Sequence, residues 1–383
     1  MAATKKIAIC MELNWPYKRH YEPFAGVQEY ANTHPDWEVS VSNFPEVEIE
    51  DGEKYAGIIG RISEPTMLAA KAHGIPVVNL WMESPVADQL PCVEVDHEMA
   101  GRIAAEHLIN RGFRQLIHYG YTRGEATKDH KRGMISVAKE HGIPYAAYDT
   151  RYQFTDKVQI WQAFIDDLIK IREKFTPPIG FVTANDQLSH AVTTKLLKLG
   201  WKSPEDFAVV GTHNDTQICD AVKPSLSSIE MGHRRCGYEA AEFMGQLIES
   251  KTTDSLKVIR IPPKELIVRG SSDAYAVDDA VLAEALKFMV LNLQQKISVP
   301  DIAAAAGVGR QTLERRFRKH LDRSVNDELI RLRVSKMKRL LVKTDYTVGE
   351  ISEMVGFGTT VNMNAMFRKF TGTTPLAYKK THV

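Results

Sequence analysis

Two segments of helical pattern near the carboxyl end, 309–320 and 359–371, carry polar residues opposite their apolar residues. The outer faces of these helices carry Gln311, Thr312, Arg315, Thr360, Asn362 and Asn364. Such side chains can donate and accept hydrogen bonds along the edges of base pairs in a major groove. Cations follow toward the helix ends, where they suit phosphates: Arg318, Lys319, Arg368 and Lys369. The pattern therefore predicts a surface that binds double-stranded DNA.

A second set of polar residues follows strand-like segments within the first 270 residues. Asp186 follows one such segment, and Asn214 and Asp215 follow another. A carboxylate can accept hydrogen bonds from two adjacent hydroxyls, and an amide can both donate and accept, which suits a sugar. Trp15 offers an aromatic face for sugar C–H groups, and Arg123 offers a donor. We expect these five residues to contact a small sugar.

Each of these residues also has a purely structural alternative. Asp186 can cap a helix that begins near residue 187. Asn214 and Asp215 can form an Asx turn. Trp15 can pack in a core or between lobes, and Arg123 can be a solvated surface charge.

Charge is distributed unevenly along the 383 residues. Residues 279–383 hold 18 Lys and Arg against 10 Asp and Glu, a local charge of +8. The preceding residues carry −7, so the net charge of +1 conceals a basic tail on an acidic body. A basic tail favours a polyanionic partner, although a solvated basic face is the simpler alternative.

Composition argues against several other classes of protein. The hydrophobic content of 44% and charged content of 25% are those of an ordinary globular protein. The four cysteines form no CxxC pair and the 13 histidines show no metal-ligand spacing, so we expect neither a disulfide framework nor a metal or other cofactor. No signal peptide or membrane-length apolar run is visible, which favours the cytoplasm and no membrane partner. No nucleophile motif or phosphate loop indicates an enzyme, although paired Asp186 and Asp215 could in principle serve acid–base catalysis.

Residues 1–270 alternate between strand-like and helical patterns. The predicted strands are 6–11, 38–42, 56–62, 76–80, 115–119, 179–183 and 207–211. The predicted helices between them include 21–32, 64–73, 100–111, 187–199 and 235–249. Such alternation is typical of βαβ units and of parallel sheets covered on both faces. Ligands bind at the carboxyl ends of strands in these sheets, so segments 14–21, 120–131, 184–186 and 212–215 matter most for function.

Two stretches resemble the sensor domain of the LacI family, which has a two-lobed periplasmic-binding-protein-like α/β fold. They read VEVDHEMAGRIAAEHLINRGFRQLIHYG and PPIGFVTANDQLSHAVTTKLLKLGWKSPEDFAVVGTHND. The resemblance covers about residues 5–270 and implies two lobes that close over a sugar or a nucleobase. His130 replaces the arginine that the family often has three residues before the glycine corresponding to Gly133. His213 replaces an aspartate that the family has two residues after the glycine corresponding to Gly211. Because the first strand starts close to Met1, the DNA-binding part is expected after the sensor.

The carboxyl-terminal hundred residues contain an internal duplication. RRFRKHLDRSV at 315–325 aligns with AMFRKFTGTTP at 365–375, an offset of 50. Each copy predicts a helix, a tight turn at Gly307 or Gly356, and a second helix. The first helices begin at 298–301 and 347–350, the second of these being a full capping box and the first a weaker one. A helix at 326–342 connects the copies, with Leu329, Leu332, Met337, Leu340 and Leu341 as core candidates.

This duplicated region resembles the DNA-binding domain of the AraC family, most specifically in GFGTTVNMNAMFRKFTGTTPLAYKK. The resemblance implies an all-α domain at 280–383 with two helix-turn-helix units, about 298–320 and 347–371, after a linker at 271–279. It implies base-reading residues Gln311, Thr312, Glu314 and Arg315 in the first unit, and Thr360, Val361, Asn362 and Ala365 in the second. Met363 replaces the usual aromatic, Asp322 the usual glycine, and Ala365 a common basic residue. The second unit is therefore expected to read sequence weakly, and Asp322 to alter a helix exit.

Together these features predict a sugar-responsive regulator of transcription. The combination resembles regulators of pentose use, which implies D-xylose as the effector, activation of the target genes, a homodimer and RNA polymerase as a further partner. The alternatives are a regulator that responds to another sugar or a nucleobase, a cytosolic sugar-binding protein without a regulatory role, a transporter-linked binding protein and a helical interaction module without DNA contact.

Overall fold

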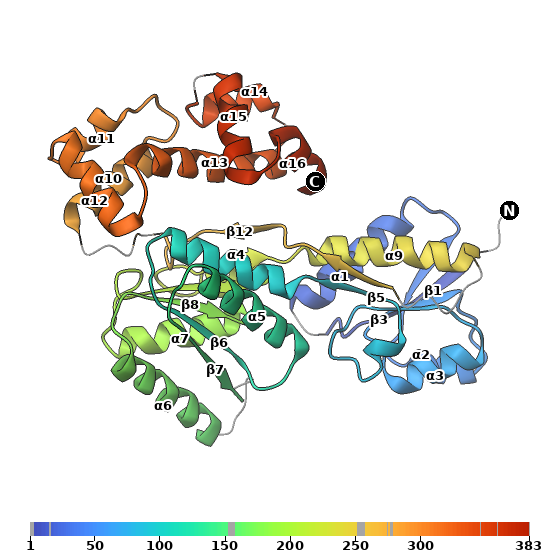
Figure 1. Ribbon diagram of the computed structural model, residues 1–383. Coiled ribbons are helices and arrows are strands. Elements are labelled where there is room, and N and C mark those ends of the chain that lie inside the picture. Colours follow the sequence, from blue (N-terminus) through green and yellow to red (C-terminus); the bar gives the residue numbers. More distant parts are fainter. Residues whose placement is uncertain are drawn as a thin grey trace. The chain divides into compact units, whose positions relative to one another are not determined.

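The computed structural model describes residues 4–14, 17–151, 158–250, 257–273, 275, 279–344, 346–357 and 359–382. The chain divides into two compact units, Met1–Ala274 and Tyr275–Val383 (Figure 1). The first unit contains two six-stranded sheets, and the second is built of helices. None of the helices in the described part of the chain has the length and apolar character that a membrane crossing requires.

Lobe A of the first unit is built on a parallel sheet in the order β11-β5-β4-β3-β1-β2. Its strands are β1 (Lys5–Cys10), β2 (Trp37–Val41), β3 (Gly57–Gly60), β4 (Val77–Asn79), β5 (Cys92–Val95) and β11 (Val258–Ile261). Helices α1 (Lys18–Ala31) and α9 (His233–Ser250) lie on one face, and α2 (Pro45–Glu50) and α3 (Glu64–Ala72) lie on the other (Figure 1). Strands β3 and β4 are buried throughout, as expected for a sheet covered on both faces.

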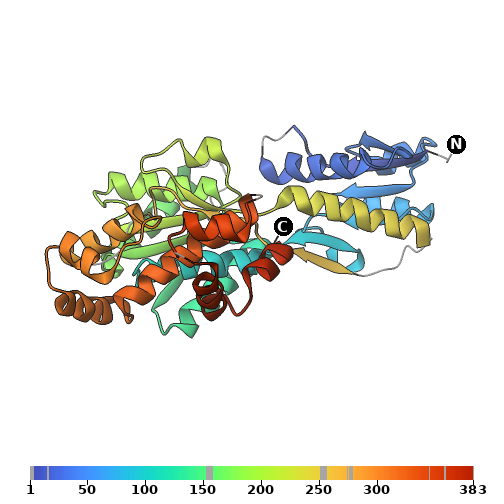
Figure 2. The same ribbon diagram turned by 90° about the horizontal axis from the view of Figure 1, so that it is seen from above.

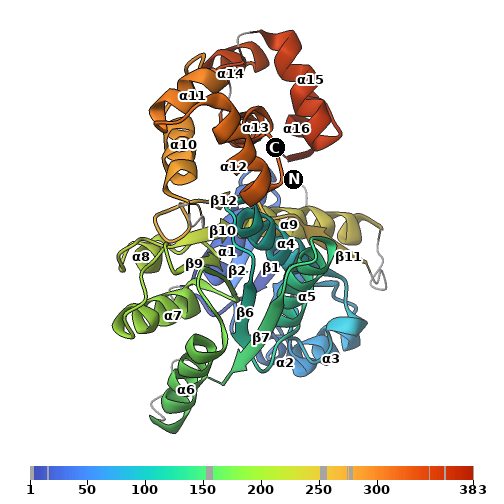
Figure 3. The same ribbon diagram turned by 60° about the vertical axis from the view of Figure 1, so that its left-hand side comes forward.

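Lobe B has a sheet in the order β12-β10-β9-β8-β6-β7, in which only β12 runs antiparallel to its neighbour. Its strands are β6 (Leu116–Tyr121), β7 (Tyr145–Thr150), β8 (Ile179–Thr183), β9 (Phe207–Thr212), β10 (Ser227–Glu230) and β12 (Glu265–Ile267). Helices α4 (His97–Asn110) and α5 (Glu125–Glu140) cover one face, and α6 (Val158–Lys174) and α7 (Asp186–Lys198) cover the other (Figure 3). The short helix α8 (Thr216–Cys219) follows β9, and a 3-10 turn at Ala87–Gln89 precedes β5 in lobe A.

The chain passes between the lobes after β5, after β10 and again between β11 and β12. Each lobe is therefore assembled from segments that are distant in the sequence. The longest separation joins α1 to α9, which lie side by side in lobe A (Figure 2). This interleaving places the carboxyl ends of β1, β8 and β9 at the junction of the lobes.

Glycines allow two helix pairs to approach closely. A Cβ atom on Gly26 of α1 would lie 1.9 Å from the carbonyl oxygen of Arg234, and one on Gly237 of α9 would lie 1.8 Å from that of Pro23. The pair α4 and α5 repeats the arrangement, with Gly101 facing the carbonyl of His130 at 2.0 Å. Because the obstacles are backbone atoms, no side-chain rotation can relieve them.

Gly26→Ala should therefore destabilise the first unit by on the order of 3 kcal/mol, because the two helices must separate to accept the methyl group. Gly349→Ala is the matched control, since a Cβ there meets only the Thr347 hydroxyl at 3.9 Å, and it should be neutral or slightly stabilising. Urea unfolding of both variants measures the difference. Equal stability of the two would contradict the packing described here.

The second unit is organised around α13 (Val325–Lys343). Before it lie α10 (Ala280–Leu291), α11 (Val299–Ala305) and α12 (Arg310–Leu321), and after it α14 (Val348–Met354), α15 (Thr360–Thr371) and α16 (Pro375–His382) (Figure 1). One core cluster includes Leu313, Phe317 and Leu329, and the other includes Met337, Met363 and Phe367. The long helix thus contributes one half to each core and connects the two helix-turn-helix units.

The duplication predicted from the sequence is confirmed at the level of helix ends. Complete capping boxes are formed by Ser298 with Asp301 and by Thr347 with Glu350. Both have the same two hydrogen bonds, so the expectation of a weaker first box is wrong. Gly307 and Gly356 turn the chain with φ of +70° and +73°. The expectation that Asp322 alters the exit of α12 is wrong, because Asp322 adopts φ +53° in the left-handed region, as Gly372 does with +74° after α15.

The predicted strands all form, with ends shifted by a few residues, but β5, β7, β10, β11 and β12 are additional. Helices α2, α5, α6 and α8 are also additional in the first unit. The linker is shorter than the predicted 271–279. Ser271 and Ser272 are fully buried in lobe B, where Ser271 donates to the carbonyl of Val209 at 2.7 Å, and Asp279 caps α10 in the second unit.

Candidate ligand pocket and nucleic-acid interface

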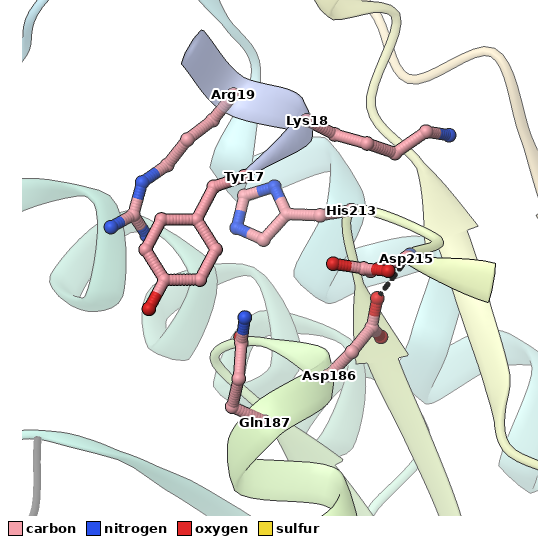
Figure 4. Close-up of a pocket in the computed structure, with 7 residues that line it drawn as sticks. All are labelled: Tyr17, Lys18, Arg19, Asp186, Gln187, His213 and Asp215. Atoms are coloured by element: carbon pink, nitrogen blue, oxygen red, sulfur yellow. Dashed lines mark hydrogen bonds between the residues drawn. The ribbon is translucent and has the colours of Figure 1, made fainter. Parts of the chain in front are cut away.

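A pocket of about 250 Å³, open to solvent, lies where the two lobes meet. Its lining residues come from the start of α1, the start of α7 and the loop after β9: Tyr17, Lys18, Arg19, Asp186, Gln187, His213 and Asp215 (Figure 4). These positions follow the carboxyl ends of β1, β8 and β9, where a parallel sheet is expected to bind its ligand.

Asp186 and Asp215 form the acidic wall of this pocket. Asn185, not Asp186, caps α7, because its side chain accepts a hydrogen bond from the amide of Leu188 at 2.8 Å. Asp186 is 1% exposed and accepts a hydrogen bond from the backbone amide of Asp215 at 2.8 Å. Burial raises the pKa of Asp186 to about 7, against the opposing effect of the Ser228 hydroxyl. The capping alternative for Asp186 is therefore wrong, and both carboxylates are placed at the pocket.

The opposite wall comes from lobe A and is cationic. Arg19 places its guanidinium over the ring of Tyr17, 4.9 Å from the centroid, and Lys18 reaches lobe B to pair with Glu230 at 2.7 Å. Donors on one wall therefore face acceptors on the other (Figure 4). A sugar hydroxyl both donates and accepts, so such a pocket can satisfy several hydroxyls at once.

The side chain of Asn214 makes hydrogen bonds within the protein. Its side-chain amide donates to Glu230 at 3.1 Å and its carbonyl accepts from Arg269 at 2.7 Å. The residue has φ +50° and is 9% exposed. The expectation that Asn214 contacts the ligand needs correction, since both ends of its amide are occupied and it does not line the pocket. Its place in this network orients Glu230, the partner of Lys18.

The remaining predicted ligand contacts are Arg123 and Trp15. Arg123 is exposed in the loop after β6 and is not among the residues that line the pocket, so the surface-charge alternative fits it better. Trp15 lies outside the described residues. Tyr17, two residues later, supplies an aromatic ring in the same segment. Sequence reasoning did not single out Tyr17, Lys18, Arg19 and Gln187, because no motif marks them. The first three nevertheless lie within the segment 14–21 that it named as functionally important, and Gln187 directly follows the segment 184–186.

Histidines gather near the junction of the lobes: His20, His97, His118, His130, His213 and His233. His213 contacts His233 with 2.9 Å between ring nitrogens, and His118 contacts His130 at 3.2 Å. The two departures from the LacI pattern thus belong to one buried cluster, with His213 at the pocket and His130 behind it. No group of three or more potential ligands in the described residues has an arrangement suited to a metal ion.

Burial lowers the pKa of His20 and His97 to about 4, and of His130 and His233 to about 3. As the pH falls from about 6.5 to 4, these rings are protonated in the unfolded chain but stay neutral in the folded one, so stability is lost. Asp186 acts in the opposite sense, because its raised pKa adds stability as the pH falls below about 7. The histidines of this cluster, whose pKa values are lowered, outnumber the buried carboxyls of Asp186 and Glu94, whose pKa values are raised, so net destabilisation is expected.

Calorimetry of the apoprotein between pH 7.5 and 4.5 should show this loss in the melting of the first unit. His233→Gln should flatten the dependence, whereas His73→Gln, on an exposed helix end, should leave it unchanged. Constant or rising stability on acidification would rule out the buried neutral cluster.

On the second unit, α12 presents the residues expected to read DNA. Gln311, Arg315, Arg318 and Lys319 are exposed and Thr312 is half-buried, whereas Leu313 and Phe317 face the core. Glu314 differs, because its carboxylate accepts a hydrogen bond from the amide of Val325 at 3.3 Å and so caps the start of α13. A role for Glu314 in positioning the connector therefore fits the structure better than base reading.

Helix α15 presents the second set. Thr360, Val361, Asn362, Ala365, Arg368 and Lys369 are all exposed. Met363 and Phe367 are fully buried, so methionine fills the place of the usual aromatic without leaving the core. Lys369 lies 3.9 Å from Asp327 and keeps a side chain 63% exposed, a pair too solvated to hold it away from another partner.

Comparison with known proteins agrees with this architecture. The family of periplasmic binding protein-like domains matches residues 105–272, and a helix-turn-helix domain family matches residues 302–381. The xylose operon regulatory protein of Escherichia coli (strain K12) is 23% identical over 387 positions, covering 98% of this chain and 96% of that protein. The xylose operon regulatory protein of Haemophilus influenzae is 23% identical over 84% of each chain.

A solved structure of the xylose-binding transcription activator XylR matches with a TM-score of 0.60 at 20% identity, covering 99% of both chains. A LacI family regulator from Enterococcus faecalis V583, solved with bound ribose, matches with a TM-score of 0.53 at 18% identity over 70% of this chain and 98% of that one. These likenesses establish the fold of two α/β lobes followed by a helical domain.

Proposed function

The chain joins a periplasmic binding protein-like domain to a helix-turn-helix domain of the AraC type, and we propose that it is a sugar-responsive transcription regulator that binds specific DNA sequences. The observation that carries this proposal is the duplicated helix-turn-helix unit with its second helices exposed. Both helices bear cations at their carboxyl-terminal ends, which suit phosphates. DNA binding places the protein in the cytoplasm, and its role is regulation and not catalysis.

The effector we propose is a pentose, with D-xylose as the first candidate. Carboxylates of Asp186 and Asp215 would accept from its hydroxyls, and Arg19 and Gln187 would donate to it. The similarity to xylose operon regulatory proteins supports the choice of sugar.

Sugar binding would act through the junction of the lobes. Glu83 of lobe A accepts from the amide of Ala126 at the start of α5 in lobe B at 3.3 Å, and Arg260 of β11 lies 3.8 Å from Asp129 of α5. A sugar held by both walls favours the state in which such contacts form. The shift can be no larger than the difference in the sugar's affinity for the two states. We infer a homodimer that presents its helix-turn-helix domains to paired DNA sites and activates transcription through RNA polymerase.

The decisive experiment combines a thermal-shift panel with DNA binding. Among pentoses, hexoses and nucleobases, D-xylose should stabilise the full chain most, by about 2.7 kcal/mol at 100 times its dissociation constant. The same sugar should change affinity for DNA selected from a random pool. Failure of every sugar to stabilise the protein would contradict the sensor role, and an unchanged DNA affinity at saturation would contradict the coupling.

Lys369→Ala tests the assignment of the helix ends to phosphates. The substitution should weaken binding to selected and random duplexes alike and reduce the slope of log affinity against log salt by about 1. Fluorescence anisotropy at several salt concentrations measures both quantities. An unchanged slope would remove Lys369 from the phosphate-binding surface.

A further inference from the structure

The two helix-turn-helix units differ in chemistry at equivalent positions. With the offset of 50, Gln311 of α12 corresponds to Val361 of α15, and Arg315 corresponds to Ala365. Each pair is spaced i, i+4, so its members are neighbours on one helix face. In both helices this face is exposed, while Leu313 or Met363 faces the core. The same place in the fold therefore offers two hydrogen-bonding side chains in the first unit and two apolar ones in the second.

Val361 has no role in folding that the structure reveals. Its side chain is 78% exposed, and valine is a poorer helix former than glutamine. The helix start depends instead on Thr359, whose hydroxyl accepts from the amide of Asn362 at 3.3 Å. An exposed apolar pair in the first half of a helix that otherwise presents polar side chains suits an apolar group on a partner.

The neighbours of this pair are those of a DNA-reading helix. Asn362 and Asn364 are exposed beside it, and an asparagine amide can make two hydrogen bonds to adenine. Arg368 and Lys369 continue the helix with phosphate-binding groups. The apolar group that a major groove displays is the 5-methyl of thymine, the base paired with adenine.

We propose that the second helix-turn-helix reads thymine methyl groups through Val361 and Ala365, whereas the first reads guanine or adenine edges through Arg315 and Gln311. The proposal rests on the proposed function and specifies its DNA target. Each binding site then has two chemically different halves about one helical turn apart, roughly 34 Å. The half under α15 contains A·T pairs at the positions read, and the half under α12 is read through hydrogen bonds.

The test removes only the methyl group. Duplexes are first selected from random DNA with the full-length protein, and thymines in each half are then replaced by deoxyuridine. Under α15 this replacement should weaken binding about threefold to fivefold for each methyl contacted, because the burial of one methyl carbon is lost. Under α12 it should have little effect, because that half is read through polar groups.

Three variants sharpen the assignment. Val361→Ala should weaken binding to the thymine duplex and reduce the difference between thymine and deoxyuridine, because only the contact of Ala365 remains intact. The matched Gln311→Ala should leave that difference unchanged. The double substitution V361Q/A365R should transfer the preference of the first half-site to the second in a new selection. Both sites are exposed, so the fold should be retained.

The outcomes separate this inference from the proposed function. Selection that enriches no sequence would contradict sequence-specific binding itself. Enrichment with no deoxyuridine effect under α15, or with an equal effect in Val361→Ala, would overturn the thymine assignment and leave the regulator role standing. A footprint confined to the half under α12 would also overturn it and assign the apolar pair to a protein partner.

Discussion

Asp215→Ala is expected to lower the affinity for the sugar by at least about 100-fold, because a charged acceptor of two hydroxyl hydrogen bonds contributes roughly 1.5–3 kcal/mol for each. The substitution isolates the carboxylate. Asp186 is held by the backbone amide of Asp215, which alanine retains, so the buried neighbour keeps its partner. The pocket should lose one functional group without collapsing.

Isothermal titration with D-xylose measures the effect, and the melting temperature of the unliganded variant checks that the fold is retained. Arg123→Ala is the matched control, since Arg123 is a sequence-based candidate that lies outside the pocket, and it should bind sugar normally. Loss of binding in Arg123→Ala with normal binding in Asp215→Ala would reverse the assignment of the site. DNA selected by the full chain should still be bound by both variants.

Arg315→Ala is expected to reduce affinity for the selected duplex by about 10-fold to 100-fold, the cost of one specific bidentate contact to a base. Affinity for random duplex should fall by much less, because phosphate contacts dominate that mode. Arg315 is exposed on α12 between the core residues Leu313 and Phe317. Its truncation therefore leaves the core cluster of the first helix-turn-helix untouched.

Competition binding with selected and random duplexes gives the specificity ratio directly. Lys369→Ala serves as the contrast, since it should lower both affinities together. A proportional loss on both duplexes for Arg315→Ala would show that this residue contacts phosphate and not a base edge. Relaxed preference at one base position in a repeated selection would identify the base that it reads.

Sequence patterns predicted two kinds of element: those stabilised by neighbouring residues in the sequence and strands that are fully buried. The capping boxes at Ser298 and Thr347, and the turns at Gly307 and Gly356, are specified by neighbouring residues. Strands such as β8 and β9 are buried throughout and mostly apolar, because helices cover both faces of the sheet. Short strands such as β10 and β12 carry no such pattern, since pairing with strands distant in the sequence stabilises them.

The sequence by itself determined that the first 270 or so residues alternate α and β and that the last hundred repeat a helix-turn-helix, because both follow from periodicity and caps. Only the tertiary structure decided which polar residues remain available for a partner. Asn214 is occupied by Glu230 and Arg269, and Glu314 by the start of α13, whereas Gln187 and Asp215 line the pocket. The physical reason is that a hydrogen bond forms only when donor and acceptor are close and aligned. The residues that pair here are separated in the sequence, so only the fold brings them together.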